Sequence, residues 1–196
     1  MAREPRIEVP GGYYHVVSRG NDKQAIFDDP LRRVFLGQLA GVAARYGWQV
    51  LAWVLMTNHF HLVFKLGDGG LSDGMHDLNY AFARASNGRF GRTNHCFGAR
   101  FWSSHLETER HLLASIRYAM WNPPRAGVGE HPGDSGWTSF GPSAGLAWAP
   151  EVLALSELLG LFGSNPARAQ RAFQRFVSDG RERCQAPWDD GRGILR

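Results

Sequence analysis

The feature that most constrains the fold is the order in which strand-like and helix-like segments follow one another between residues 13 and 122. The strand-like segments are short, apolar and bounded by turn residues, whereas the helix-like segments keep one apolar face. The first helix, for example, has Leu31, Phe35 and Leu39 on one side. Asp29-Pro30 is expected to supply its cap and its first helical position. In chain order, the expected strands are 13–18, 48–55, 59–66 and 101–107, and the expected helices are 30–46, 71–90 and 109–121.

The first six segments follow the order β-α-β-β-α-β, and the third helix comes after the last strand. This order predicts an α+β, ferredoxin-like fold, in which a split βαβ unit forms an antiparallel sheet. We expect helices on one face of the sheet and the other face free for a ligand. After Gly127, a passage rich in Gly, Pro and Ser predicts a boundary, and two short helices are expected beyond it, at 151–162 and 166–178. The predicted division is a main domain over residues 1–130 and a loop with a small helical C-terminal extension over 131–196.

Composition argues against a membrane or secreted protein. No apolar run approaches the about eighteen residues needed to cross a bilayer. The charged N-terminal segment MAREPRIEVPGG lacks the apolar stretch of a signal peptide. Cys96 and Cys184 are too few for a disulfide framework or a CxxC metal site. We therefore expect a cytoplasmic protein with two unpaired thiols and no membrane partner.

Positive charge is concentrated in one part of the chain. The formal net charge is +4, and 20 of the 22 basic residues are arginine. Between residues 84 and 125, seven arginines and two glutamates give +5, and aromatic residues lie among them. Guanidinium groups suit phosphates and aromatic faces suit unstacked bases, so this region predicts a surface for single-stranded nucleic acid. A solvated basic face is the alternative.

A His-x-His pattern stands at the start of the third expected strand. Because successive side chains of a strand point to opposite faces, His59 and His61 are expected on one face and Phe60 in the core. Two imidazoles side by side suit one divalent ion. A structural pair on the sheet surface explains the pattern equally well, so the pattern alone leaves both roles open.

The third expected helix offers a candidate nucleophile. Its apolar stripe leaves four polar residues on another face, at spacings of four, three and four. They are His111, Ser115, Tyr118 and Asn122. We expect Tyr118 to lie off the core side, with a packing role for its ring as the alternative. A positioned tyrosine beside a metal ion is a competent nucleophile toward a phosphodiester, and Asn122 is placed to complete the metal shell.

Four segments of the chain occur in a consistent order: HVVSRGN at 15–21, WVLMTNHFHLVF at 53–64, FGARFWSSHLE at 97–107 and RYAMWNPPRAG at 117–127. Together they resemble the single-tyrosine transposases of the HUH nuclease superfamily, and within it the REP-associated tyrosine transposases (the RAYT group). GWTSF at 136–140 is similar to a downstream segment of the same family. The resemblance runs from about residue 13 to 140, and its order makes it more specific than any single motif.

The resemblance implies that His59 and His61 bind a divalent metal ion, Mg²⁺ or Mn²⁺, and that Tyr118 is the catalytic nucleophile. It implies cleavage and rejoining of single-stranded DNA through a 5′-phosphotyrosine intermediate, without ATP or another nucleotide cofactor. The substrates of the group are repetitive extragenic palindromes folded into hairpins with a short single-stranded flank. On this interpretation, residues 1–130 are the catalytic domain of a bacterial protein that lies on the nucleoid when it is bound to DNA.

The arginine-rich region around the expected site suits such a substrate, because phosphate contacts position the DNA and stacking holds unpaired bases. The expected DNA-binding residues are Arg19, Arg84, Arg89, Arg92, Arg100, Trp102, Arg117 and Arg125.

Two other functions are compatible with parts of the pattern. A histidine-triad nucleotide hydrolase also carries His-x-His on a strand, but it needs a third histidine where this chain has Val63. A non-catalytic hairpin-DNA-binding protein derived from a transposase is the stronger alternative. The presence of His59, His61 and Tyr118 argues against a non-catalytic protein. The sequence leaves the oligomeric state open.

Overall fold

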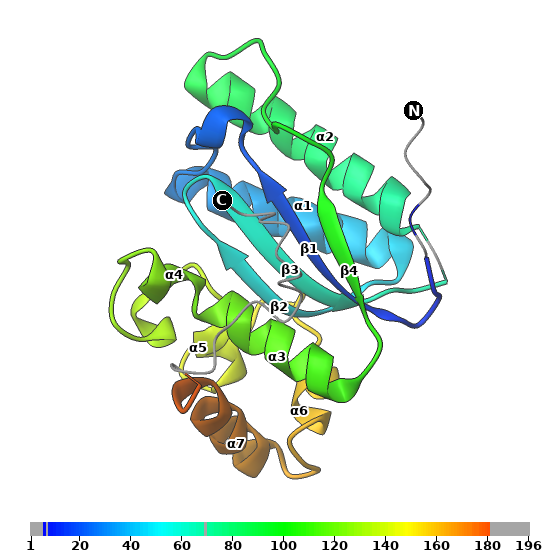
Figure 1. Cartoon of the computed structure of the whole chain (residues 1–196), viewed down its shortest axis with the longest axis vertical. Coiled ribbons are helices and arrows are strands. Elements are labelled where there is room, and N and C mark those ends of the chain that lie inside the picture. The colour runs from blue at the N-terminus through cyan, green and yellow to red at the C-terminus, as the bar shows by residue number, and fades with distance from the viewer. Residues whose placement is uncertain (1–5, 7, 69, 181–196) are drawn as a thin grey trace.

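The structure, a computed structural model, describes residue 6 and residues 8–68 and 70–180 (Figure 1). Cys184 lies outside these residues. The strands are β1 (Tyr13–Arg19), β2 (Gln49–Leu55), β3 (His59–Lys65) and β4 (Trp102–Leu106). The longer helices are α1 (Asp29–Tyr46), α2 (Leu71–Phe90), α3 (Glu109–Met120) and α7 (Pro166–Ser178). The shorter helical elements are η1 (Asn21–Lys23), α4 (Asn122–Arg125), η2 (Pro132–Asp134), α5 (Phe140–Ser143) and α6 (Leu155–Gly160).

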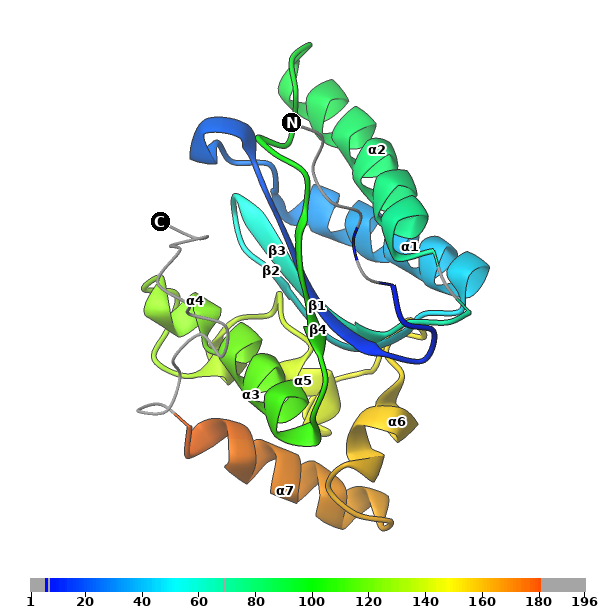
Figure 2. The ribbon, with the colours of Figure 1, turned by 45° about the vertical axis from the view of Figure 1, so that its right-hand side comes forward.

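The four strands form one sheet in the order β2-β3-β1-β4, and each neighbouring pair is antiparallel. The central strands are therefore the first and the third along the chain, as the β-α-β-β-α-β order requires. This arrangement confirms the predicted α+β, ferredoxin-like sheet. Strand β4 lies at one edge, and Figure 2 shows it between α2 on one side and α3 on the other.

Helices α1 and α2 cover one face of the sheet (Figure 1). The core between them contains Phe35, Phe60 and Phe82, all fully buried. The side chain of Asp28 caps α1 by accepting a hydrogen bond from the backbone N–H of Leu31, at 3.0 Å. The expected cap was Asp29, so the predicted helix start is wrong by one residue.

The second face of the sheet is also covered, which corrects the expectation that it is free for a ligand. Helix α3 packs across the strands, α6 packs against β2, and α7 packs against α3, α5 and α6 (Figures 1 and 2). A second hydrophobic core forms there, with Leu51 and Val63 from the sheet and Leu112 and Ile116 from α3. The physical reason is that α3 is apolar on one side and has no other surface on which to bury that side.

The segment after residue 130 completes this second core. Phe140 and Phe173 are fully buried in it, from α5 and α7. The indole N–H of Trp121, at the end of α3, donates to the backbone carbonyl of Val177 at 2.8 Å. The C-terminal extension thus packs on the sheet and on α3, and the division at residue 130 stays a prediction. No helix in the described part of the chain is long and apolar enough to span a membrane.

Candidate active site

Two neighbouring strands place histidines and an arginine on the face of the sheet that α3 covers. In the β1–β3 register, Arg19 lies opposite His59, and Val17 lies opposite His61. Phe60, between the two histidines, is buried in the core on the other face. The alternation predicted for His59-Phe60-His61 is therefore present.

The environment of the pair differs from the expectation. His61 is fully buried between the sheet and α3, and His59 is half-buried. His61 therefore does not lie on a free face of the sheet, because α3 closes over its end of the strand. Their ring centroids are 5.2 Å apart.

Helix α3 places Tyr118 against these histidines. Thr108 caps the helix by accepting a hydrogen bond from the N–H of His111, at 3.1 Å. The Tyr118 ring lies 5.9 Å from the ring of His61 and 6.3 Å from that of His15, measured between centroids. With 5% of its surface exposed, Tyr118 is buried and does not lie off the core side as expected. The side chain of Tyr118 therefore lies beside the histidines, next to the apolar stripe of α3 that packs on the sheet.

Each histidine of the pair has one ring nitrogen fixed by a neighbour. Nδ1 of His61 is 2.9 Å from Nε2 of His15, which is fully buried on β1. Nδ1 of His59 is 2.7 Å from Oδ1 of Asn58. Metal-binding histidines generally hold one ring nitrogen in such a contact and offer the other to the ion. The arrangement therefore leaves Nε2 of both histidines as the candidate ligand atoms.

A buried nitrogen supports this geometry. Nε2 of His61 is buried and has no hydrogen-bond partner among the described residues, and the same holds for Oγ of Ser115 on the facing helix. Unsatisfied buried polar atoms are rare in folded proteins and call for a water, an ion or a functional role. Within the described residues, no group of three or more His, Cys, Asp or Glu side chains is arranged to hold a metal ion. The two imidazoles fit one ion, but further ligands would have to be amide, water or phosphate oxygens.

Burial keeps the histidines neutral. Desolvation lowers the pKa of His15 to about 3 and that of His59 to about 4, and it holds the pKa of His61 well below its usual range. The positive charges of Arg19 and Arg125 lower the pKa of His61 further. Neutral imidazoles are the form that binds a metal ion. These two arginines thus lie close enough to the histidine pair to bring a phosphate to it.

Asn122 follows α3 and closes its end. Its side-chain amide donates to the backbone carbonyl of Tyr118 at 2.9 Å. With the amide nitrogen committed to the helix end, the oxygen is the atom left for a ligand. Asn122 as a metal ligand stays a prediction.

The structure divides the expected DNA-binding residues into three groups. Arg19, Trp102 and Arg125 surround the histidines and Tyr118, with the Trp102 ring 5.6 Å from that of His15 and the Arg125 guanidinium 5.2 Å from the centroid of the Tyr118 ring. Arg84 and Arg100 are exposed on the α2 side of the sheet.

The third group makes structural contacts. Arg89 forms an ion pair with Asp28 at 2.7 Å, and Arg92 donates to the carbonyl of Ala25 at 2.7 Å. Arg117 stacks on Phe176 of α7, 4.7 Å from the ring centroid. Trp121, one of the aromatic residues between the arginines of 84–125, is 4% exposed and is not available to stack on a base.

His15 was not singled out from the sequence, although it lies in the first of the four quoted segments. Strand alternation alone places it on the same face as Val17 and Arg19. The signal that was missed is the register, because only the pairing of β1 with β3 brings His15 next to His61.

A comparison with known protein families identifies the family of this chain. The profile of the family described as "Transposase IS200 like" matches residues 8–111. The chain belongs to the IS200-like transposase family. This IS200-like transposase has His59 and His61 inside the matched range, whereas Tyr118 and Asn122 follow it. No curated protein matches the chain significantly.

Two solved structures are similar to this transposase. One is described as a REP-associated tyrosine transposase bound to a REP hairpin; it is 19% identical, with a TM-score of 0.65, and the match covers 78% of this chain and 93% of the other. The second is a putative transposase from Deinococcus radiodurans R1, 17% identical, with a TM-score of 0.40, covering 62% of this chain and 95% of the other. The first likeness confirms the fold.

Proposed function

We propose that this transposase cleaves and rejoins single-stranded DNA with Tyr118 as the nucleophile. The observation that carries the proposal is the position of the Tyr118 ring, 5.9 Å from the His61 ring and below the guanidinium of Arg125. A tyrosine, two neutral imidazoles and two arginines next to one another suit phosphodiester chemistry.

The reaction conserves the number of phosphodiester bonds. The hydroxyl oxygen of Tyr118 attacks the phosphorus, a bond from phosphorus to the tyrosine oxygen forms, and the bond to the 3′ oxygen breaks. The phenolic proton is lost to solvent, and the departing 3′ oxygen takes up a proton to become a 3′-OH. The other fragment stays on the protein as a 5′-phosphotyrosine. Attack by a 3′-OH reverses the step and joins DNA, so no ATP is needed.

A divalent ion, Mg²⁺ or Mn²⁺, would be held by Nε2 of His59 and His61 and by the side-chain oxygen of Asn122, and it would polarise the scissile phosphate. His15 is a positioning residue in this proposal, because its contact with Nδ1 of His61 fixes which nitrogen faces the ion. Arg19 and Arg125 would neutralise the phosphate and orient it toward Tyr118.

The substrate we propose is a DNA hairpin with a single-stranded flank. The family membership supports a DNA substrate, and the similar solved structure is of a transposase bound to a REP hairpin. One group of arginines lies beside Tyr118 and another lies on the α2 side. Two such groups suit a DNA with two parts, the hairpin stem and its single-stranded flank. A bacterial protein bound to such repeats would lie on the nucleoid.

Covalent capture tests the nucleophile. A pool of hairpins with randomised flanks and a fluorophore at the 3′ end would be incubated with the protein and Mn²⁺ and then run on a denaturing gel. A fluorescent protein band is expected for the wild type, because the 5′-phosphotyrosine fragment keeps the labelled end. Tyr118→Phe should abolish the band and leave DNA affinity within a few-fold. Tyr46→Phe, whose hydroxyl lies on the helical layer beside Asp77, is the matched control.

Two outcomes would overturn the proposal. A band that persists in Tyr118→Phe would assign the nucleophile to another residue. Tight hairpin binding without any band from the wild type would indicate a non-catalytic hairpin-binding protein.

A further inference from the structure

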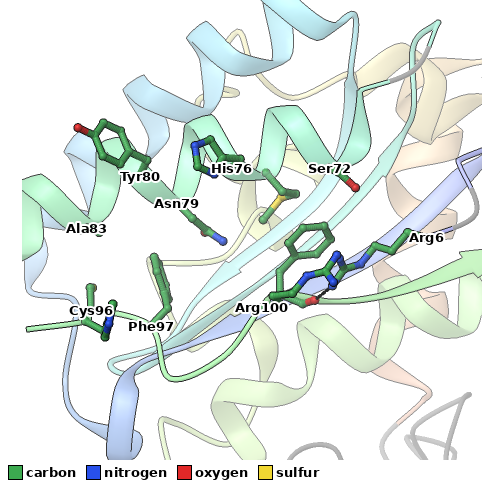
Figure 3. Close-up of a pocket in the computed structure, with 12 residues that line it drawn as sticks. Arg6, Ser72, His76, Asn79, Tyr80, Ala83, Cys96, Phe97 and Arg100 are labelled. Atoms are coloured by element: carbon green, nitrogen blue, oxygen red, sulfur yellow. Dashed lines mark hydrogen bonds between the residues drawn. The ribbon is translucent and has the colours of Figure 1, made fainter. Parts of the chain in front are cut away.

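A pocket of about 440 Å³ lies on the other side of the sheet from Tyr118. Its walls are one side of α2, the segment 95–101 that leads into β4, and Arg6. Figure 3 shows Tyr80, His76 and Asn79 on α2, across from the segment that carries Phe97 and Arg100, with the Asn79 side chain directed toward that segment. The volume lies within the range of small-ligand pockets in proteins.

The pocket walls combine aromatic rings with positive charge. Tyr80 is 60% exposed, and its ring is nearly parallel to that of His76, with an interplanar angle of 12°. The guanidinium of Arg84 lies 6.0 Å from the Tyr80 ring centroid, and Arg100 is exposed at the rim. None of the described residues that line the pocket carries a carboxylate. This chemistry suits a planar group attached to an anion.

Asn79 adds a directional hydrogen-bond acceptor to the pocket wall. Its amide nitrogen donates to the hydroxyl of Ser18 at 3.1 Å, and this contact fixes the orientation of the side chain. Its Oδ1 is buried and has no hydrogen-bond partner among the described residues. A ligand that offers an N–H group at the edge of a planar ring would satisfy this oxygen.

The edge strand connects this pocket with the proposed active site. Phe101 lines the pocket, whereas the next residue, Trp102, lies on the opposite face beside His15. Because β4 is at the edge of the sheet, a flexible single strand of DNA can pass around β4 from one face of the sheet to the other (Figure 2). A rigid duplex would not follow so sharp a turn.

We propose that this pocket binds an unpaired nucleotide of the DNA strand that also reaches Tyr118. The base would stack on Tyr80, an amino or imino group of the base would donate to Oδ1 of Asn79, and Arg100 would hold the adjoining phosphate. A base that is paired within a stem cannot enter such a pocket without leaving the stack. The inference rests on the proposed function for the identity of the ligand as single-stranded DNA.

Equilibrium binding tests the pocket without cleavage. Fluorescence anisotropy would be measured in Tyr118→Phe protein, with chelator, for a hairpin with a single-stranded flank and for the same stem without it. Tyr80→Ala should weaken binding of the flanked hairpin by about 5- to 150-fold, the equivalent of one stacked base, and leave stem binding unchanged. Tyr80→Phe should retain the affinity. Arg100→Gln should weaken flank binding, whereas Arg45→Gln, an exposed arginine beside Tyr46, should not.

Abasic substitution then locates the base. Each unpaired nucleotide of the flank would be replaced in turn by an abasic one. At one position, the loss should match that of Tyr80→Ala, and the two changes together should cost no more than either alone.

The outcomes separate this inference from the proposed function. If wild-type protein forms the covalent adduct but Tyr80→Ala has no effect on the flank, the pocket is not a nucleotide site and the function stands. If Tyr80→Ala weakens stem and flank equally, the pocket contributes only general affinity and the inference is wrong. Coupling to one abasic position in a protein that forms no adduct would support the pocket and overturn the catalytic proposal.

Discussion

The single substitutions His59→Ala and His61→Ala should lower the free energy of unfolding by very different amounts. His61 is fully buried between the sheet and α3 and contacts His15, whereas His59 is half-buried. His61→Ala opens a cavity in a packed interface, worth about 2 kcal/mol, and removes a buried hydrogen bond, worth about 1 kcal/mol. The expected loss is therefore about 3 kcal/mol, against about 1 kcal/mol or less for His59→Ala.

The assay is urea unfolding followed by tryptophan fluorescence, at pH 7.5 with chelator so that metal binding does not contribute. For a chain of this size, the loss for His61→Ala corresponds to a fall of about 6–12 °C in Tm. His95→Ala, at an exposed histidine, is the control and should be close to the wild type. Equal losses for His59→Ala and His61→Ala would refute the placement of His61 beneath α3. The practical consequence is that His59→Ala is the cleaner variant for testing metal-dependent cleavage.

Three further predictions follow from the same site. Without metal, the free energy of unfolding should fall as the pH falls from about 6.5 to 4, because the unfolded chain binds protons at His15, His59 and His61 that the folded protein, with its lowered pKa values, does not bind. The loss is up to about 1.4 kcal/mol per pH unit for each of these histidines. A flat urea midpoint over this range would contradict their burial. Mn²⁺ or Mg²⁺ should raise the Tm of the wild type but not of His59→Ala, by the equivalent of about 2.7 kcal/mol at a hundred times the Kd, and a shift retained in the variant would place the metal elsewhere. Arg125→Ala should weaken DNA binding and reduce the salt slope of the logarithm of affinity by about one, as expected for one lost phosphate contact, and an unchanged slope would remove Arg125 from the DNA surface.

Much of the fold could be predicted from local patterns. The alternation in HFH and the cap at Thr108 depend on neighbours in sequence, and both are present in the structure. The cap of α1 shows the limit of such signals, since Asp28 and Asp29 are chemically identical and only the backbone geometry selects Asp28.

Relations between distant segments could not be predicted in the same way. Tyr118 was expected to lie off the core side, but it is buried beside the histidines, and Ser115 is fully buried as well, because the apolar stripe of α3 packs on the C-terminal extension as well as on the sheet. The arginines between residues 84 and 125 are close in sequence, yet the sheet separates Arg84 from Arg125. A run of charge along a chain does not define one surface when an edge strand intervenes.

The position of α3 between the sheet and α7 also bears on how such a protein can change over generations. The helix that carries Tyr118 is apolar on the side that α7 covers, and the indole N–H of Trp121 at its end donates a hydrogen bond to the carbonyl of Val177. A lineage that lost α7 would expose that apolar side and release the end of the helix one turn from the tyrosine. Replacement of the extension by an unrelated segment would require compensating polar substitutions along α3 before catalysis could persist. The extension and Tyr118 are thus expected to be inherited as a unit, and exchange of C-terminal segments between such transposases should rarely yield an active one.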